Sequence, residues 1–493
     1  MSSPDPQSVK ASATVFVIFG ATGDLSRKKI FPSFFELFKT NLLPEKLKII
    51  AAARSAYTSK QFAESLKENI KADDKNLWRK FSSLIEYIQC DVESGKNLSL
   101  LSQKLETVEK TNKVCTQRVL YMAVSPFIYQ KAFENLGKYK FNLGCQKHGK
   151  LSRIVTEKPF GFDYQSAHNL NEILNKYFEE SQIFRIDHFL GKETVQNIFA
   201  FRFGNEIFEP VWNRDFVDNV QITLAERIGI EKRGEFYDKM GALRDVVQNH
   251  LLQLLTIVTM NEPSTFSRDS IRRQKIEVLK AIRPFSKDDI IKNTIRGQYV
   301  GYSQEASVAK NSQTETFALV KFFIDNERWQ EVPFYLKTGK KLTGAVTSII
   351  FQFKEQGHEL FKNFWQKPIP NHITLQIQPD EGIGISLVAK KPGLTTVLEP
   401  VDMEFCYKKS FDVPQPNAYE RLLMDIIIGD QTLFLGRVGN SWKIIDPIEK
   451  MWQKGQPKLE IYKPGSWGPN SADKLIAADG RKWLAPILTI CKI

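Results

Sequence analysis

Residues 14–23 read TVFVIFGATG, and this stretch decides how the first half of the chain folds. Its first six residues are all β-branched or aromatic, which predicts a buried strand that ends at Gly20. The apolar spacing over 26–38 then predicts a helix. Further apolar runs lie at 47–53, 118–124 and 153–157. Buried strands that alternate with helices are typical of a parallel, doubly wound sheet, so we expect an α/β domain of Rossmann-like fold over residues 13–185.

The pattern changes beyond residue 200. Short alternating runs separated by turn residues predict a mostly antiparallel sheet. These runs lie at 348–354, 372–378, 383–389 and 401–407, and apolar helices are predicted at 242–260 and 418–428. We therefore expect a larger α+β domain over residues 186–493, and a disordered polar segment over residues 1–12.

The composition excludes several classes of protein. Hydrophobic residues make up 42% and charged residues 25% of the 493 residues, as in an ordinary globular protein. The net charge of +13 is scattered along the chain, which argues against nucleic acid as a partner. The most apolar stretch, 251–260, is far shorter than the ~20 residues of a membrane span, and the polar N-terminus lacks the apolar core of a signal peptide.

The cysteine pattern argues against a disulfide framework and against a structural zinc site. The five cysteines are odd in number and include no C-x-x-C pair. We therefore expect a protein of a reducing compartment, the cytoplasm.

The first candidate site is the turn between the first strand and the first helix, formed by Gly20, Thr22, Gly23, Asp24 and Leu25. Two glycines three residues apart let the backbone turn sharply and approach a pyrophosphate, whose charge meets the helix N-terminus. The spacing G-x-x-G is not the full dinucleotide fingerprint, so an ordinary strand-to-helix turn remains an alternative.

Arg54 follows the second strand, at the place where NAD enzymes carry an acidic residue for the ribose hydroxyls. An arginine there suits a 2′-phosphate, which indicates NADP. A solvated arginine at the end of a strand is the alternative.

The segment 185–193 reads RIDHFLGKE and concentrates titratable side chains. On a regular strand Asp187 and His188 would point to opposite faces, so we expect different roles for them. Lys192 lies where a helix is predicted to start, and a bound anion would explain a cation there. A polar loop between the domains is the alternative.

The apolar helix at 242–260 carries one polar stripe. At about 100° of rotation per residue, this stripe contains Asp245. His250 lies at the edge of the stripe, about 140° around the helix axis from Asp245. The other members of the stripe are Asn249, Gln253 and Thr256. A histidine beside such groups is a candidate for acid/base chemistry, whereas an isolated core histidine is usually structural.

Together these clusters resemble the glucose-6-phosphate dehydrogenase family. The resemblance rests on GATGDLSRKKIFPSFFELF at 20–38, TEKPFG at 156–161, RIDHFLGKE at 185–193, AERIGIEKRGEFYDKMGALRDVVQNHLLQ at 225–253 and VPFYLKTGKKL at 332–342. It implies oxidation of glucose 6-phosphate at C1 to 6-phosphoglucono-lactone, with hydride transfer to NADP and without a metal. This is the first step of the oxidative pentose phosphate pathway.

The resemblance also implies a role for each residue of the site. His250 would be the catalytic base, and Asp187 would orient it. The substrate-binding residues would be Lys158, His188, Lys192, Glu226, Asp245 and Lys340, with His188 and Lys192 on the phosphate. NADP would be held by Gly20, Thr22, Gly23, Asp24, Leu25, Arg54, Lys158 and Pro159.

The chain departs from the family pattern at three places. Phe189 replaces a usual Tyr, Ala345 replaces a usual basic residue, and 123–126 read AVSP where A-x-P-P is common. The changes at Phe189 and Ala345 affect positions that would contact the phosphate of the substrate. We therefore expect weaker substrate binding. Lys337, or a residue from elsewhere in the fold, is the expected replacement.

Two other functions remain open at this stage: a dehydrogenase for another sugar phosphate, and a non-catalytic regulatory paralogue of the same fold. The resemblance implies a homodimer or homotetramer. A second, structural NADP near Lys390 and Lys391 stays undecided.

Overall fold

The computed structural model describes residues 13–485, apart from 113, 146–149, 356–358, 365–369, 412, 414 and 438. The predicted disorder of residues 1–12 therefore lies outside the described residues. The contacts divide the chain into two compact units. Unit 1 comprises Met1–Lys192, Ser264–Arg272 and Pro416–Gly439, and unit 2 comprises Glu193–Pro263, Arg273–Gln415 and Asn440–Ile493.

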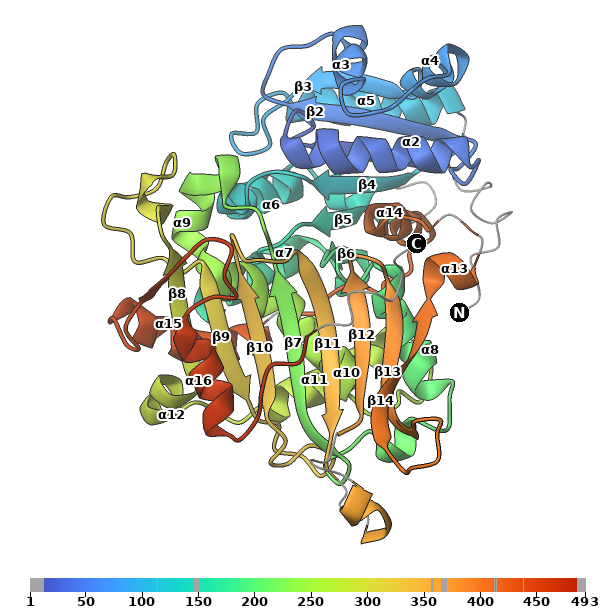
Figure 1. Cartoon of the computed structure of the whole chain (residues 1–493). Helices are drawn as coiled ribbons and strands as arrows, with labels where there is room; N and C mark the ends of the chain where they lie inside the picture. Colours follow the sequence, from blue (N-terminus) through green and yellow to red (C-terminus); the bar gives the residue numbers. More distant parts are fainter. Residues whose placement is uncertain are drawn as a thin grey trace. The chain divides into compact units, whose positions relative to one another are not determined.

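Unit 1 contains a six-stranded sheet in the order β3-β2-β1-β4-β5-β6, with every pairing parallel (Figure 1). Its strands are β1 Thr14–Phe19, β2 Leu47–Ala53, β3 Ile85–Gln89, β4 Gln117–Met122, β5 Arg153–Thr156 and β6 Ile183–Arg185. All side chains of β1 are buried, as expected for a central strand. The predicted doubly wound parallel sheet is confirmed, whereas β3 and β6 were not predicted.

Helices connect these strands. The first helical segment begins at Ser26 as the π-helical stretch η1 Ser26–Ile30 and continues as α2 Phe31–Lys39. The others in unit 1 are α3 Ser59–Leu66, α4 Lys75–Ser82, α5 Leu98–Asn112, α6 Tyr129–Lys138, α7 Tyr164–Tyr177 and α14 Ala418–Ile428. α14 has the bounds expected from periodicity, but it does not belong to the second domain as expected. Contacts with α2 place it in unit 1.

Unit 2 contains a nine-stranded sheet in the order β14-β13-β12-β11-β7-β10-β9-β8-β15. Most of its pairings are antiparallel, which confirms the prediction; the exceptions are β10 with β7 and β15 with β8. The strands are β7 Val217–Ala225, β8 Thr294–Tyr299, β9 Phe317–Phe322, β10 Phe334–Gly339, β11 Val346–Phe353, β12 His372–Gln378, β13 Gly382–Lys390, β14 Leu398–Cys406 and β15 Glu460–Tyr462.

A long helical segment of unit 2 packs on β7, β9 and β10, with α10 behind the strands in Figure 1. It consists of α9 Gly234–Ala242, the π-helical η8 Leu243–Leu251 and α10 Leu252–Thr259. The remaining helices are α8 Glu193–Phe203, α11 Arg268–Ala281, α12 Lys287–Asn293, α13 Tyr407–Ser410, α15 Gly439–Gln453 and α16 Asn470–Ala478. Among the residues described above, none of the helices combines the length and the hydropathy needed to span a bilayer.

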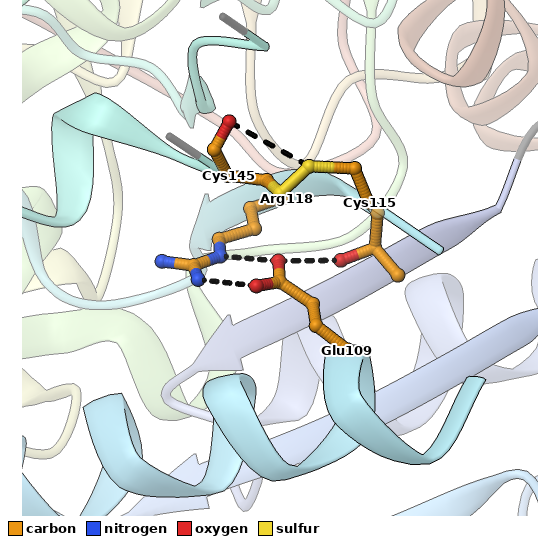
Figure 2. Close-up of a disulfide and its surroundings, with 5 residues drawn as sticks. Glu109, Cys115, Arg118 and Cys145 are labelled. Atoms are coloured by element: carbon orange, nitrogen blue, oxygen red, sulfur yellow. Dashed lines mark hydrogen bonds and ion pairs between the residues drawn. A yellow bond between two sulfur atoms is a disulfide. The ribbon is translucent and has the colours of Figure 1, made fainter. Parts of the chain in front are cut away.

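A disulfide joins Cys115 to Cys145 in unit 1, with 5.7 Å between the two Cα atoms (Figure 2). The sequence favoured a chain without a disulfide framework, and this bond runs against that expectation. The two residues are 30 apart in sequence and meet only because the crossover through α6 returns the chain to the start of β4. No local spacing pattern could show this. Beside the disulfide, Arg118 makes two hydrogen bonds of 3.0 and 2.9 Å to Glu109.

Removing this disulfide should destabilise unit 1. Closing a loop of this length restricts the unfolded chain, so replacing both cysteines by Ala should lower the free energy of unfolding by about 2–4 kcal/mol. Urea denaturation of the double variant and of the unchanged protein, both without reductant, measures the difference. Equal stability of the two proteins would contradict a disulfide that contributes to folding.

Candidate active site

The glycine turn after β1 has the geometry of a backbone cradle. Gly20 has a positive φ of 78°, and a Cβ at this position would lie 2.2 Å from the carbonyl oxygen of Ala123. The Gly23 N–H donates to the Gly20 oxygen at 2.9 Å, and the Ser26 hydroxyl donates to the same oxygen at 3.0 Å. Only glycine fits at position 20. Because glycine has no side chain, the backbone here can approach a ligand at this edge of the sheet closely. This observation fits the pyrophosphate of a dinucleotide.

Arg54 and the glycine turn lie at the same edge of the unit 1 sheet. Phe19 pairs with Ala52 in the parallel register of β1 and β2, so Gly20 and Arg54 follow directly after two neighbouring strand ends. Arg54 is exposed, and its carbonyl oxygen accepts a hydrogen bond of 2.9 Å from Gln89. An exposed guanidinium at this edge is suited to a phosphate on the adenosine ribose.

A second pair of strand ends brings Lys158 close to the RIDH segment. Thr156 pairs with Arg185 in the parallel register of β5 and β6, and the Ile186 N–H donates to the Thr156 oxygen at 2.9 Å. Lys158, which is half-buried and joined to Pro159 by a cis peptide bond, therefore lies at the same edge as Asp187 and His188.

Asp187 and His188 lie beyond the end of β6, so the regular strand on which opposite orientations were expected does not reach them, but the two residues differ in exposure. Asp187 is fully buried, and its Oδ1 accepts a hydrogen bond of 3.0 Å from the Phe189 N–H. His188 is half-buried, and its ring stacks on Tyr419 at 6.2 Å with an interplanar angle of 11°. Lys192 precedes α8, as predicted, and its Nζ lies 4.3 Å from the centre of the Phe189 ring.

In unit 2, Glu226 and Lys340 form an ion pair at the ends of two parallel strands. Ala225 of β7 pairs with Gly339 of β10, so the next residue of each strand reaches the same edge. Lys340 is buried, and its Nζ lies 5.6 Å from the centre of the Tyr237 ring. These two residues offer a paired cation and anion, which suits a polyhydroxylated, charged ligand.

Asp245 and His250 lie on η8, and both are buried. The separation of about 140° expected from an α-helix is wrong here, because the segment is π-helical. In a π-helix each backbone hydrogen bond spans five residues, so residues five apart are separated by about one turn. The side-chain amide of Asn249 donates to the carbonyl oxygen of Arg244 at 3.4 Å. Asp245 and His250 therefore share one side of the helix.

The residues that set this helix were not predicted. Gly241 breaks the helical path with a φ of 68°, and a Cβ there would lie 2.2 Å from Oε1 of Glu315. The same oxygen accepts a hydrogen bond of 2.9 Å from the Leu243 N–H at the start of η8. Burial raises the pKa of Glu315 to about 8.

Two further residues beside these groups were also missed. The Arg233 guanidinium lies 3.5 Å from Oδ1 of Asp245. Within the described chain, the buried Tyr237 hydroxyl has no hydrogen-bond partner, and its pKa is raised by burial and by the nearby carboxylates of Asp245, Glu315 and Glu226. A buried hydroxyl of this kind can bind a polar ligand. Both residues lie within the stretch that carries the family resemblance, which is the signal that could have identified them.

Lys337 does not have the environment expected of a replacement phosphate ligand. Its Nζ lies 3.6 Å from the Trp483 ring and 5.5 Å from the Trp467 ring, and burial lowers its pKa to about 7. Lys337 lies within β10, whereas Lys340 follows the end of that strand and lies beside Tyr237, so the two amines have different neighbours. The aromatic surroundings of Lys337 therefore do not support its expected role on the phosphate. Lys341 is 2.8 Å from Glu305 in an ion pair.

Comparisons with known proteins agree with this arrangement. Two family models cover nearly the whole chain: the NAD binding domain of glucose-6-phosphate dehydrogenase matches residues 17–197, and the C-terminal domain of the same enzyme matches residues 199–484. The chain is 40% identical over 491 residues to the glucose-6-phosphate 1-dehydrogenase of Chlamydia pneumoniae, covering 95% of each protein.

Other relatives show the same extent of similarity. The chain is 38% identical to the Treponema pallidum enzyme of the same name, covering 97% of this chain and 96% of the relative. A solved structure of glucose-6-phosphate dehydrogenase in complex with its substrate glucose-6-phosphate matches with a TM-score of 0.88 at 34% identity, covering 96% of this chain and 99% of that one.

Proposed function

This chain belongs to the glucose-6-phosphate dehydrogenase family, and from that premise we propose which of its residues bind the substrate and which take part in the reaction. The enzyme oxidises glucose 6-phosphate at C1 to 6-phosphoglucono-lactone with NADP as oxidant, the first step of the oxidative pentose phosphate pathway.

His250 accepts the proton of the C1 hydroxyl as hydride leaves the same carbon. Its burial on η8 removes competing water, and a positioned base contributes about 10²- to 10⁴-fold to the rate. Asp187 orients the imidazole and stabilises its protonated form. The fully buried carboxylate of Asp187 has the low exposure that makes such a charge effective.

Substrate binding uses charged groups from several strand ends. His188 and Lys192 bind the phosphate, and Glu226, Asp245 and Lys340 contact the sugar or its phosphate. The ion pair of Glu226 with Lys340 holds both side chains in defined positions before substrate binds. Lys158 lies between the sugar and the coenzyme.

NADP would be held by the turn from Gly20 to Leu25, by Arg54, and by Lys158 and Pro159. When bound, it supplies the hydride acceptor. The cradle at Gly20 fits this coenzyme because a side chain there would meet the Ala123 oxygen. The chain contributes position, the proton acceptor and the exclusion of water.

The observation that carries this assignment is the buried His250 on a π-helical turn shared with Asp245. The test is formation of NADPH with glucose 6-phosphate, glucose and galactose 6-phosphate. We expect turnover with glucose 6-phosphate far above that with the other two. Preference for galactose 6-phosphate would favour a dehydrogenase for another sugar phosphate, and no turnover would favour a regulatory paralogue.

The enzyme assembles as a homodimer or homotetramer in this proposal. β14 is an edge strand of the unit 2 sheet, and Val401 and Met403 on it are 44% and 61% exposed. Leu387 of β13 pairs with Val401 and is 38% exposed, so these apolar side chains share one face. An exposed apolar face at a sheet edge suits a second copy of the chain. Light scattering after size exclusion measures the mass.

The cytoplasm remains the proposed location. The odd cysteine count does not support this location, because Cys115 and Cys145 are bonded. The substrate supports it, since a phosphorylated sugar and NADP are metabolites of the cell interior.

Phe189→Tyr together with Ala345→Lys should lower the KM for glucose 6-phosphate. The new tyrosine keeps its ring against Lys192 and adds a hydroxyl, and Ala345 is exposed, so a lysine fits there. One charge-assisted bond corresponds to about tenfold or more in affinity. Steady-state kinetics measures KM, and kcat should stay nearly constant.

The control variant, Phe364→Tyr with Ala477→Lys, makes the same two substitutions at other positions. A KM that rises or stays constant in Phe189→Tyr with Ala345→Lys would mean that other groups bind the phosphate.

A further inference from the structure

Glu157 is a buried carboxyl group that the proposed reaction does not use. It lies between β5 and Lys158 and is 7% exposed. Its Oε1 accepts a hydrogen bond of 2.6 Å from the Tyr121 hydroxyl, and the Tyr419 hydroxyl donates to the same carboxylate. Its backbone is held as well, because the Tyr129 hydroxyl accepts from the Glu157 N–H at 2.9 Å and donates to its carbonyl oxygen at 3.0 Å. Three elements of unit 1 therefore hold this one residue: β4 through Tyr121, α6 through Tyr129 and α14 through Tyr419.

The charges around Glu157 belong to the candidate site. Burial raises the pKa of this carboxyl to about 7, and the hydroxyls of Tyr121 and Tyr419 and the charge of Lys158 oppose that effect. The negative charge of Asp187 raises the pKa further. Glu157 therefore changes charge near neutral pH while facing two residues assigned to substrate binding and catalysis.

Tyr419 connects Glu157 to the phosphate-binding side. Its ring stacks on the His188 imidazole, and its position in the first turn of α14 is fixed by Asn417, whose Oδ1 accepts from the Tyr419 N–H at 2.9 Å. The turn that carries His188 also touches α14, because a Cβ on Gly191 would lie 2.7 Å from the Ala418 oxygen. The path from Glu157 to His188 thus consists of one hydrogen bond and one ring stack.

We propose that Glu157 is a positioning residue that holds Tyr419 against His188 and keeps a negative charge beside Lys158 during substrate binding. This role rests on the proposed function, since it assumes that His188 binds the phosphate of glucose 6-phosphate. Two consequences follow from it. Loss of the Tyr419 hydroxyl should leave His188 less firmly held. Loss of the Glu157 charge should change the KM for glucose 6-phosphate only at pH values at which that carboxyl is ionised.

Two variants separate these consequences. Tyr419→Phe keeps the ring stack and removes only the hydroxyl, so the KM for glucose 6-phosphate should rise about tenfold with kcat changed much less. Glu157→Gln keeps a hydrogen-bond acceptor and removes the charge. The ratio of its KM to the KM of the unchanged protein should be near 1 at pH values below the pKa of Glu157. Above that pKa the ratio should depart from 1. Taking the ratio at each pH cancels the titration of the substrate.

The matched control is Tyr335→Phe in unit 2. The Tyr335 hydroxyl also donates to a carboxylate, at 2.5 Å to Asp479, so this variant loses a similar bond away from the Glu157 cluster. Its KM for glucose 6-phosphate should stay constant. A rise in this control equal to that of Tyr419→Phe would show a general loss of stability and would overturn the proposal.

An infrared titration tests the charge change without any turnover. The carbonyl band of a protonated carboxyl should disappear as pH rises through about 7, and this component should be missing in Glu157→Gln. An identical difference spectrum in both proteins, or unchanged KM in both variants at every pH, would overturn the role of Glu157. Absence of glucose 6-phosphate turnover in the unchanged protein would instead contradict the proposed function, so the two failures are distinguishable.

Discussion

Replacing His250 with Asn should lower kcat by about 10²- to 10⁴-fold and leave the KM for glucose 6-phosphate nearly constant. The amide is close to the imidazole in size and is polar, so the buried position on η8 stays filled. It cannot accept the C1 proton, and that loss affects the transition state more than substrate binding. Steady-state kinetics at a fixed, neutral pH measures both constants.

His168→Asn is the matched control for this variant. His168 is an exposed histidine on α7 and stacks on Tyr164. The same substitution there should leave kcat and KM constant. Near-normal turnover in His250→Asn would show that another group accepts the proton.

Replacing Arg54 with Ala should raise the KM for NADP about ten- to a hundredfold and leave the KM for NAD nearly constant. The guanidinium follows β2 at the edge that carries the glycine cradle, and charge-assisted bonds to a phosphate are worth about 1.5–3 kcal/mol. NAD lacks the 2′-phosphate and so loses nothing. Kinetics with both coenzymes measures the change in preference.

Arg79→Ala, an exposed arginine on α4, is the control for the coenzyme experiment. It should leave both constants unchanged. Equal use of NAD and NADP by the unchanged protein would mean that Arg54 does not contact the ribose phosphate.

The sequence predicts the long buried elements well because burial on both faces produces an uninterrupted apolar run. β1, β2 and α14 have the bounds that periodicity indicated. β6 was missed because three residues are too few to show a period, and β3, an edge strand, has only one fully buried side chain. β7 was missed although it is long, since Asp218, Asn219 and Gln221 interrupt its apolar pattern.

The candidate site was predicted residue by residue but not in its local geometry. Helical periodicity cannot distinguish an α-helix from the π-helix of η8, and the start of this helix depends on Gly241 and on Glu315, which is distant in sequence. The disulfide and the Glu157 cluster were missed for the same reason. Cys115 meets Cys145, and Glu157 meets Tyr419, only after the chain has folded. The roles assigned to the site residues stay predictions until the variants are measured.

The most direct test of the central claim follows the hydride. Glucose 6-phosphate carrying deuterium at C1 is turned over with NADP, and mass spectrometry of the reduced coenzyme and of the lactone shows where the deuterium goes. We predict that the deuterium appears in the reduced coenzyme and is absent from the lactone, because C1 is the carbon oxidised. Reduced coenzyme without deuterium, or no reduced coenzyme at all, would contradict the assignment of this chain as a glucose-6-phosphate dehydrogenase that acts at C1.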